Sequence, residues 1–198
     1  MLYVDDILLT SKNMNNILEL KTKLSGEFEM KDLGWAKKIL GMNIVRNRDK
    51  NILKLHQKTY LEKIITKFSI HDSKPISLPL ASHFKLDDTL SLVTDEENKS
   101  MAKIRYNNAI GSLMYATVST RPDLSFARSV LSRYMCNPGK KHWEAAKWLF
   151  RYIKGTSNVG LVYGRKGGTK LKLEGFVDAD YAGNKDNRRS TTTYVFFP

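Results

Sequence analysis

The sequence has very little cysteine: one residue, Cys136, among 198. A single thiol cannot form an internal disulfide, which excludes a secreted scaffold held together by disulfides. A structural zinc site usually needs about four ligands in paired spacings, and one cysteine with four scattered histidines does not supply them. We therefore expect Cys136 to be an ordinary, partly buried thiol.

Long hydrophobic runs are also missing. No stretch approaches the roughly 20 apolar residues of a membrane-spanning helix, and the N-terminus lacks the basic-then-apolar pattern of a signal peptide. These absences favour an intracellular protein with no membrane partner. The hydrophobic content of 41% is nevertheless high enough for a buried core, which argues against a disordered chain.

Acidic residues are scarce relative to basic ones. The 33 Lys and Arg against 20 Asp and Glu give a net charge of +13. A polyanion, most commonly nucleic acid, is the expected partner of such a chain. The alternatives are a solvated basic surface without a partner and, more weakly, a membrane surface, because the basic residues are spread along the chain.

The first 70 residues alternate between hairpin and helix patterns. Short apolar runs that flank polar turns predict two β-hairpins. The first covers residues 2–9, and the second has strands at 39–45 and 52–55. Apolar residues three and four positions apart predict amphipathic helices over 16–28 and 60–68.

Residues 71–100 differ in composition, with two prolines, several serines and a run of acids. We expect a connector with little regular structure, whose acids lie in a solvated loop and do not bind metal. From Arg105 the pattern turns helical up to about residue 154. Pro122 suits the first position of a helix, and Asp123 suits its first turn, where the helix dipole favours negative charge. After residue 156, segments 159–163, 171–177 and 192–197 are predicted as strands.

The helix predicted at about 141–154 carries a basic face, made by Lys140, Lys147, Arg151 and Lys154. Such a face either contacts phosphates or is simply solvated, and both readings remain open at this point. Trp143 and Trp148 on the same helix are more typical of a core than of a platform for stacking bases.

Asp5 and Asp6 lie between the two apolar runs of the first hairpin. Burying two carboxylates there costs several kcal/mol unless they meet cations. Adjacent carboxylates at a hairpin tip suit the binding of a divalent metal for phosphoryl transfer, because Mg²⁺ prefers carboxylate oxygens together with substrate phosphates. The alternative is a polar turn without further function.

The chain resembles the copia group of retrotransposon Pol polyproteins over almost its whole length. Tyr3-Val4-Asp5-Asp6 is similar to the metal-binding hairpin of reverse transcriptases. Further matching stretches follow in order at residues 28–34, 39–42, 111–116, 120–123, 143–147, 151–156, 178–180 and 186–191.

The resemblance implies an α+β fold in four parts. These are a partial polymerase palm of β-hairpins and helices (1–70), a connector (71–100), a helical thumb or connection region (101–156), and the N-terminal strands of a truncated, incomplete ribonuclease H-like sheet (157–198). It also implies an RNA-directed DNA polymerase with ribonuclease H, acting on an RNA template, a DNA primer, dNTPs and the RNA–DNA hybrid. The expected location is the cytoplasm, within a virus-like particle, and the remainder of the Pol polyprotein is an expected partner.

The resemblance also assigns site residues. Asp5 is implied as a direct Mg²⁺ ligand with Asp6 as its close partner, and Asp178 as the first carboxylate of the ribonuclease H site. Tyr3 and the four cations of the basic face are implied as nucleic-acid contacts.

The other carboxylates of both two-metal sites would precede Met1 or follow Pro198, so we expect the chain on its own to be inactive. The alternative is a truncated relic that acts at most as a non-catalytic nucleic-acid-binding protein. Thr193 stands where copia sequences usually have Gly, a substitution that would strain the strand if the position required positive φ.

Overall fold

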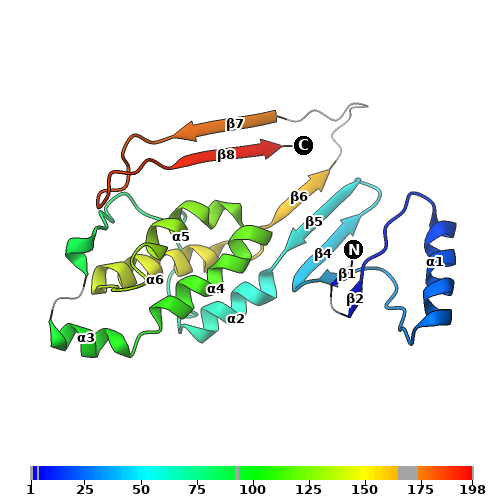
Figure 1. The fold of residues 1–198 in the computed structure, drawn as a ribbon, viewed down its shortest axis with the longest axis horizontal. Coiled ribbons are helices and arrows are strands. Elements are labelled where there is room, and N and C mark those ends of the chain that lie inside the picture. The colour runs from blue at the N-terminus through cyan, green and yellow to red at the C-terminus, as the bar shows by residue number, and fades with distance from the viewer. Residues whose placement is uncertain (1, 4, 92–93, 165–173, 198) are drawn as a thin grey trace.

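The computed structural model describes residues 2–3, 5–91, 94–164 and 174–197. Antiparallel strands alternate with helices up to α2, helices then follow one another up to α6, and the remaining strands come last, a mixed helix and antiparallel-sheet order that agrees with the predicted α+β class (Figure 1). The elements, with η for short 3₁₀ helices, are β1 (Leu2–Tyr3), β2 (Asp6–Ile7), α1 (Met14–Glu27), β3 (Lys38–Ile39), β4 (Met42–Asn47), β5 (Ile52–His56), α2 (Lys58–Lys67), η1 (Asp88–Leu90), α3 (Asp95–Ala102), α4 (Tyr106–Ser119), η2 (Pro122–Leu124), α5 (Ser125–Ser132), α6 (Lys140–Gly155), β6 (Leu161–Gly164), β7 (Glu174–Ala179) and β8 (Thr192–Phe197).

The second hairpin is confirmed, but its first strand is shorter than predicted. The expected strand over 39–45 is interrupted after β3, and the chain turns back through Leu40 and Gly41 to pair β3 with β4. Leu40 and Gly41 have φ values of 48° and 70°, the positive φ at both central residues that a tight hairpin turn requires. Tyr115 on α4 donates a hydrogen bond from its hydroxyl to the Leu40 carbonyl, so the turn is held against the helices.

A four-stranded sheet forms in the order β3-β4-β5-β6. Its last strand comes from far along the chain, with Ile52 opposite Gly164 and Leu55 opposite Leu161. A side chain at Gly160 would collide with the carbonyl oxygen of Leu55, so glycine permits the close approach of the two segments. The proposed boundary at residue 156 therefore separates β6 from the strand to which it is hydrogen-bonded.

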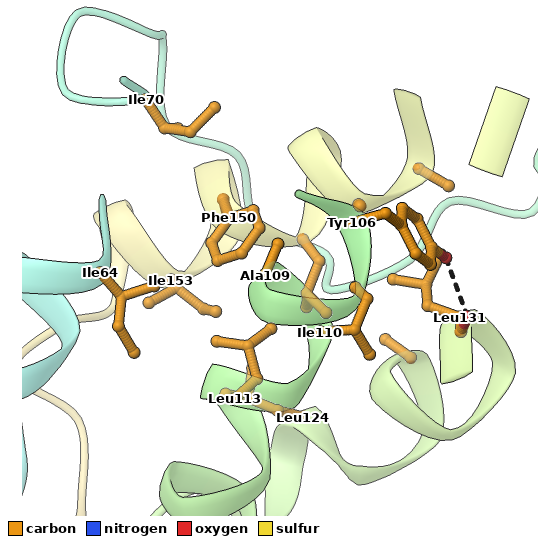
Figure 2. Close-up of a cluster of buried hydrophobic side chains, with 14 of the residues drawn as sticks. Ile64, Ile70, Tyr106, Ala109, Ile110, Leu113, Leu124, Leu131, Phe150 and Ile153 are labelled. Carbon is orange, nitrogen blue, oxygen red and sulfur yellow. Dashed lines mark hydrogen bonds between the residues drawn. The ribbon is translucent and has the colours of Figure 1, made fainter. Parts of the chain in front are cut away.

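The hydrophobic core lies among α2, α4, α5 and α6 (Figure 2). Ile110, Leu113 and Phe150 are fully buried there, and the Tyr106 hydroxyl donates to the Leu131 carbonyl at 2.8 Å. Helix α1, in contrast, has no buried residue and lies at the end of the molecule away from the core (Figure 1). Thus the core belongs to the helices that follow residue 57.

The connector is more ordered than predicted, because it contains η1 and α3. Thr94 accepts a hydrogen bond from the Glu97 backbone N–H, and the Glu97 side chain accepts one from the Thr94 N–H. This reciprocal pair is a capping box, and the Thr-x-x-Glu spacing was readable in the sequence. The acids at the start of α3 favour a helix N-terminus through the helix dipole, which the loop prediction overlooked.

Strands β7 and β8 form a separate antiparallel hairpin. Residues 171–173 of the predicted strand lie outside the described residues, and the strand continues to Ala179. Thr193 pairs with Asp178 in regular register, and the described residues with positive φ do not include Thr193. In the part of the chain that the structure describes, none of the helices has the length and apolar composition needed to cross a bilayer.

Candidate functional site

The first hairpin presents its two carboxylates to solvent. β1 and β2 pair antiparallel, with Leu2 opposite Ile7 and Tyr3 opposite Asp6, so that Asp5 lies in the turn. Both Asp5 and Asp6 are exposed, and the desolvation cost expected for buried carboxylates does not arise. The side chain of Tyr3 lies outside what the structure describes.

Two adjacent, exposed carboxylates have the donor chemistry that Mg²⁺ prefers. However, no group of three or more His, Cys, Asp or Glu side chains able to hold a metal occurs among the described residues. Asp5 and Asp6 therefore offer a part of a metal site, and the ligands present do not complete it.

Asp178 lies on a different sheet from Asp5 and Asp6. It is exposed on β7, and its Oδ1 accepts a hydrogen bond from the Ala179 N–H at 2.9 Å. Two neighbouring acids have structural contacts: Asp180 accepts from the Thr191 N–H at 2.5 Å, and Asp186 accepts from the Asp88 N–H at 2.9 Å. Among the described residues, these three acids do not form a group able to hold a metal ion.

The basic face of α6 divides into two halves. Lys140 and Lys147 are exposed. Arg151 donates from Nε to the Lys74 carbonyl at 2.7 Å, and Lys154 donates from Nζ to the Ser73 carbonyl at 2.7 Å. Two of the four predicted phosphate contacts thus hold the connector against the helix, a role that helical spacing cannot reveal because the acceptors are backbone atoms distant in sequence.

A buried network around Arg121 joins two of the sequence motifs. Arg121 is fully buried and forms two hydrogen bonds with the Asp123 carboxylate, at 2.8 and 2.9 Å. It donates two more to the carbonyl and hydroxyl oxygens of Thr156. The Tyr152 hydroxyl donates to Asp123 at 2.9 Å. These hydrogen bonds hold segment 120–123 against the C-terminal end of α6. The sequence analysis did not predict this contact.

The network also sets the protonation of Asp123. Burial raises the pKa of this carboxyl group, whereas the hydrogen bonds and the positive charge of Arg121 lower it. The lowering effects together outweigh the effect of burial, so the pKa of Asp123 lies below its ordinary value. Burial, together with the hydrogen bond to Asp123, raises the pKa of the Tyr152 hydroxyl. Asp123 therefore stays ionised as the partner of Arg121 down to acidic pH.

A second contact links the β7–β8 hairpin to the helices. The ring of Tyr134 stacks on the buried ring of His142, with centroids 4.0 Å apart, and its hydroxyl donates to Asp186 at 3.1 Å. His142 Nδ1 accepts from the Gly139 N–H at 2.9 Å, which closes the first turn of α6. Burial lowers the pKa of His142, and the nearby Asp87, Asp88 and Asp186 oppose this effect only in part.

We expect the stability of the protein to fall as the pH drops below about 6.5, because of His142. A lowered pKa means that the unfolded chain binds the proton more readily than the folded one, so stability rises with pH across this window. The contribution is at most about 1.4 kcal/mol per pH unit. Urea unfolding between about pH 7.5 and 5 should show a shallower dependence for His142→Gln, which can keep the cap. An unchanged pH dependence in this variant would contradict the assignment.

Comparison with known proteins places these features in a family context. Residues 1–82 match the model of a family described as reverse transcriptase (RNA-dependent DNA polymerase). The chain is 49% identical over 196 residues to the retrovirus-related Pol polyprotein from transposon TNT 1-94 of Nicotiana tabacum, covering 99% of this chain and 14% of that polyprotein. It is 34% identical to the Pol polyprotein from transposon RE1 of Arabidopsis thaliana, covering all of this chain and 13% of that polyprotein.

A shorter relative is covered more fully. An uncharacterized mitochondrial protein of Arabidopsis thaliana is 36% identical over 197 residues, which span 77% of its length. The chain thus covers most of this protein but only about one seventh of the polyproteins. No solved structure matches the chain.

Proposed function

The chain belongs to the reverse transcriptase family of copia-type retrotransposon Pol polyproteins, and from this membership we propose that it contributes the carboxylate hairpin of an RNA-directed DNA polymerase. The observation that carries this proposal is the β1–β2 hairpin, which holds Asp5 in its turn and leaves Asp5 and Asp6 open to solvent. A hairpin of this kind can present both carboxylates to a metal ion and a phosphate at once.

In a longer polyprotein, Asp5 and Asp6 would hold Mg²⁺ together with ligands from other segments. When bound, Mg²⁺ would neutralise charge on the phosphates of the nucleotide being joined. The hairpin's own contribution is to fix the spacing and direction of the two carboxylates, because backbone pairing between Tyr3 and Asp6 restricts the turn.

The nucleic acid would be an RNA template with a DNA primer. Lys140 and Lys147 are the exposed cations of α6 that we assign to its phosphates, where they would position the strands without reading sequence. The β7–β8 hairpin would be the first part of a ribonuclease H sheet, with Asp178 as one of the carboxylates that cut the RNA of the hybrid. The compartment implied is a cytoplasmic virus-like particle.

Replacing Asp5 or Asp6 with asparagine in a Pol polyprotein that contains this chain should reduce RNA-templated primer extension by about 100-fold or more. The amide keeps the size of the side chain but removes the charge that binds metal. Asp49→Asn, an exposed aspartate in the β4–β5 turn, is the matched control and should leave extension unchanged. Full activity in the Asp5→Asn and Asp6→Asn polyproteins would rule out the proposed site.

The second candidate is a non-catalytic nucleic-acid-binding protein derived from such an element. It is favoured by the incomplete set of metal ligands among the described residues. Primer extension by a Pol polyprotein that contains this chain distinguishes the two. Incorporation that depends on Asp5 supports the polymerase, whereas binding without incorporation at any Mg²⁺ concentration supports the binding protein.

A further inference from the structure

A groove of about 660 Å³ lies between the connector and α6. One side is a face of α6, where Lys141, Glu144 and Trp148 follow each other at helical spacing, and the other side is formed by His83, Phe84 and Lys85. We propose that this groove binds a single strand of nucleic acid. The inference rests on the proposed function, in which the chain binds nucleic acid. It specifies that an unpaired strand binds, and that it binds in this groove.

The charge of the groove favours a polyanion. Lys85, Lys141, Lys147 and Arg151 line it together with one acid, Glu144, which leaves a formal excess of three positive charges. Glu144 is already paired with Lys141 at 2.9 Å. Within the described residues, no carboxylate lies within ion-pair distance of Lys85 or Lys147. Phosphates of a bound strand would relieve the repulsion among these cations.

The groove is held in shape before any ligand arrives. Trp148 donates from its indole nitrogen to the Leu78 carbonyl at 3.0 Å, and Arg151 donates to the Lys74 carbonyl. The Arg151 guanidinium also lies 5.4 Å from the Trp148 ring centre. These contacts fix the connector on α6, so binding a ligand would cost little conformational entropy in the protein.

Aromatic rings favour unpaired bases over a duplex. The exposed ring of His83 lies 4.3 Å from that of Phe84 and 5.4 Å from that of Trp148. Every nucleobase can stack on such a surface regardless of sequence. In a duplex the faces of the bases are covered by their neighbours, whereas a single strand can turn one face onto His83.

The test is fluorescence anisotropy of the full chain with a labelled oligodeoxythymidine of about 12 nucleotides and a duplex of the same length. Lys85→Gln with Lys147→Gln should weaken single-strand binding at least about tenfold and reduce the log–log salt slope by about 1.4, at about 0.7 per phosphate contact. The matched control, Lys63→Gln with Lys103→Gln, removes the same charge from exposed sites outside the groove and should keep the slope of the unaltered chain.

His83→Ala should weaken binding of the single strand about fivefold or more and leave duplex binding and the salt slope unchanged. All five positions are exposed, so folding is expected to be preserved. Equal losses of single-strand affinity in the two double variants would show that binding depends only on the overall positive charge, and would overturn the proposal. Single-strand binding by His83→Ala as tight as that of the unaltered chain would also overturn it. The groove variants retain Asp5 and Asp6, and the binding test does not require polymerase activity. If the Asp5 and Asp6 variants showed that the proposed metal site is wrong, the binding result for the groove would still stand or fall by itself.

Discussion

Replacing Arg121 with methionine is expected to destabilise the protein by about 3–5 kcal/mol. Arg121 is fully buried and donates four hydrogen bonds, two to Asp123 and two to Thr156. Methionine can fill a similar volume, but it leaves Asp123 without a cation and Thr156 without two donors. Removing one partner of a buried ion pair costs more than the pair itself contributes, because the remaining charge is uncompensated.

Urea unfolding followed by circular dichroism measures this change. Arg133→Met is the matched control, since Arg133 is exposed on the neighbouring helix end, and its effect should stay within about 0.5 kcal/mol. The loss should be largest near neutral pH. The lowered pKa of Asp123 means that its contribution is present above the unfolded pKa and is lost as the pH falls through the folded value. Equal stability of Arg121→Met and the control would show that the network is dispensable.

Phe150→Ala is the second large effect, with an expected loss of about 3–5 kcal/mol. Phe150 on α6 is fully buried and stacks on Phe68 with ring centres 5.4 Å apart. Truncation removes both the buried apolar surface and the contacts of the ring, and the surrounding helices can close the cavity only in part.

Phe126→Ala provides the control for this prediction, because Phe126 lies on a neighbouring helix and is 59% exposed. Its loss should stay within about 0.5 kcal/mol when both variants are compared by urea unfolding. Similar losses at the two positions would mean that the core does not lie between α2 and α6 as described.

Local patterns carried much of the prediction. The helices α1, α2 and α6 and the β4–β5 hairpin were predicted within a few residues, because apolar spacing follows the period of a helix or a turn separates two strands. The family followed from the motif series beginning with Tyr3-Val4-Asp5-Asp6, and the comparisons confirm it. The error in the connector was avoidable, since the Thr94–Glu97 capping box is itself a local signal.

The sequence by itself thus determined the family, the α+β class and the hairpin that carries Asp5 and Asp6, because these depend on motifs and on neighbours within a few residues. That both carboxylates are exposed was shown by the structure. Only the tertiary structure decided that β6 pairs with β5, that Arg121 joins residues 120–123 to Thr156, and that Arg151 and Lys154 bind the connector. Each of these contacts joins groups far apart in the chain, often through backbone atoms that every residue carries. The spacing of side chains along the sequence does not identify such partners, because they become neighbours only in the folded chain.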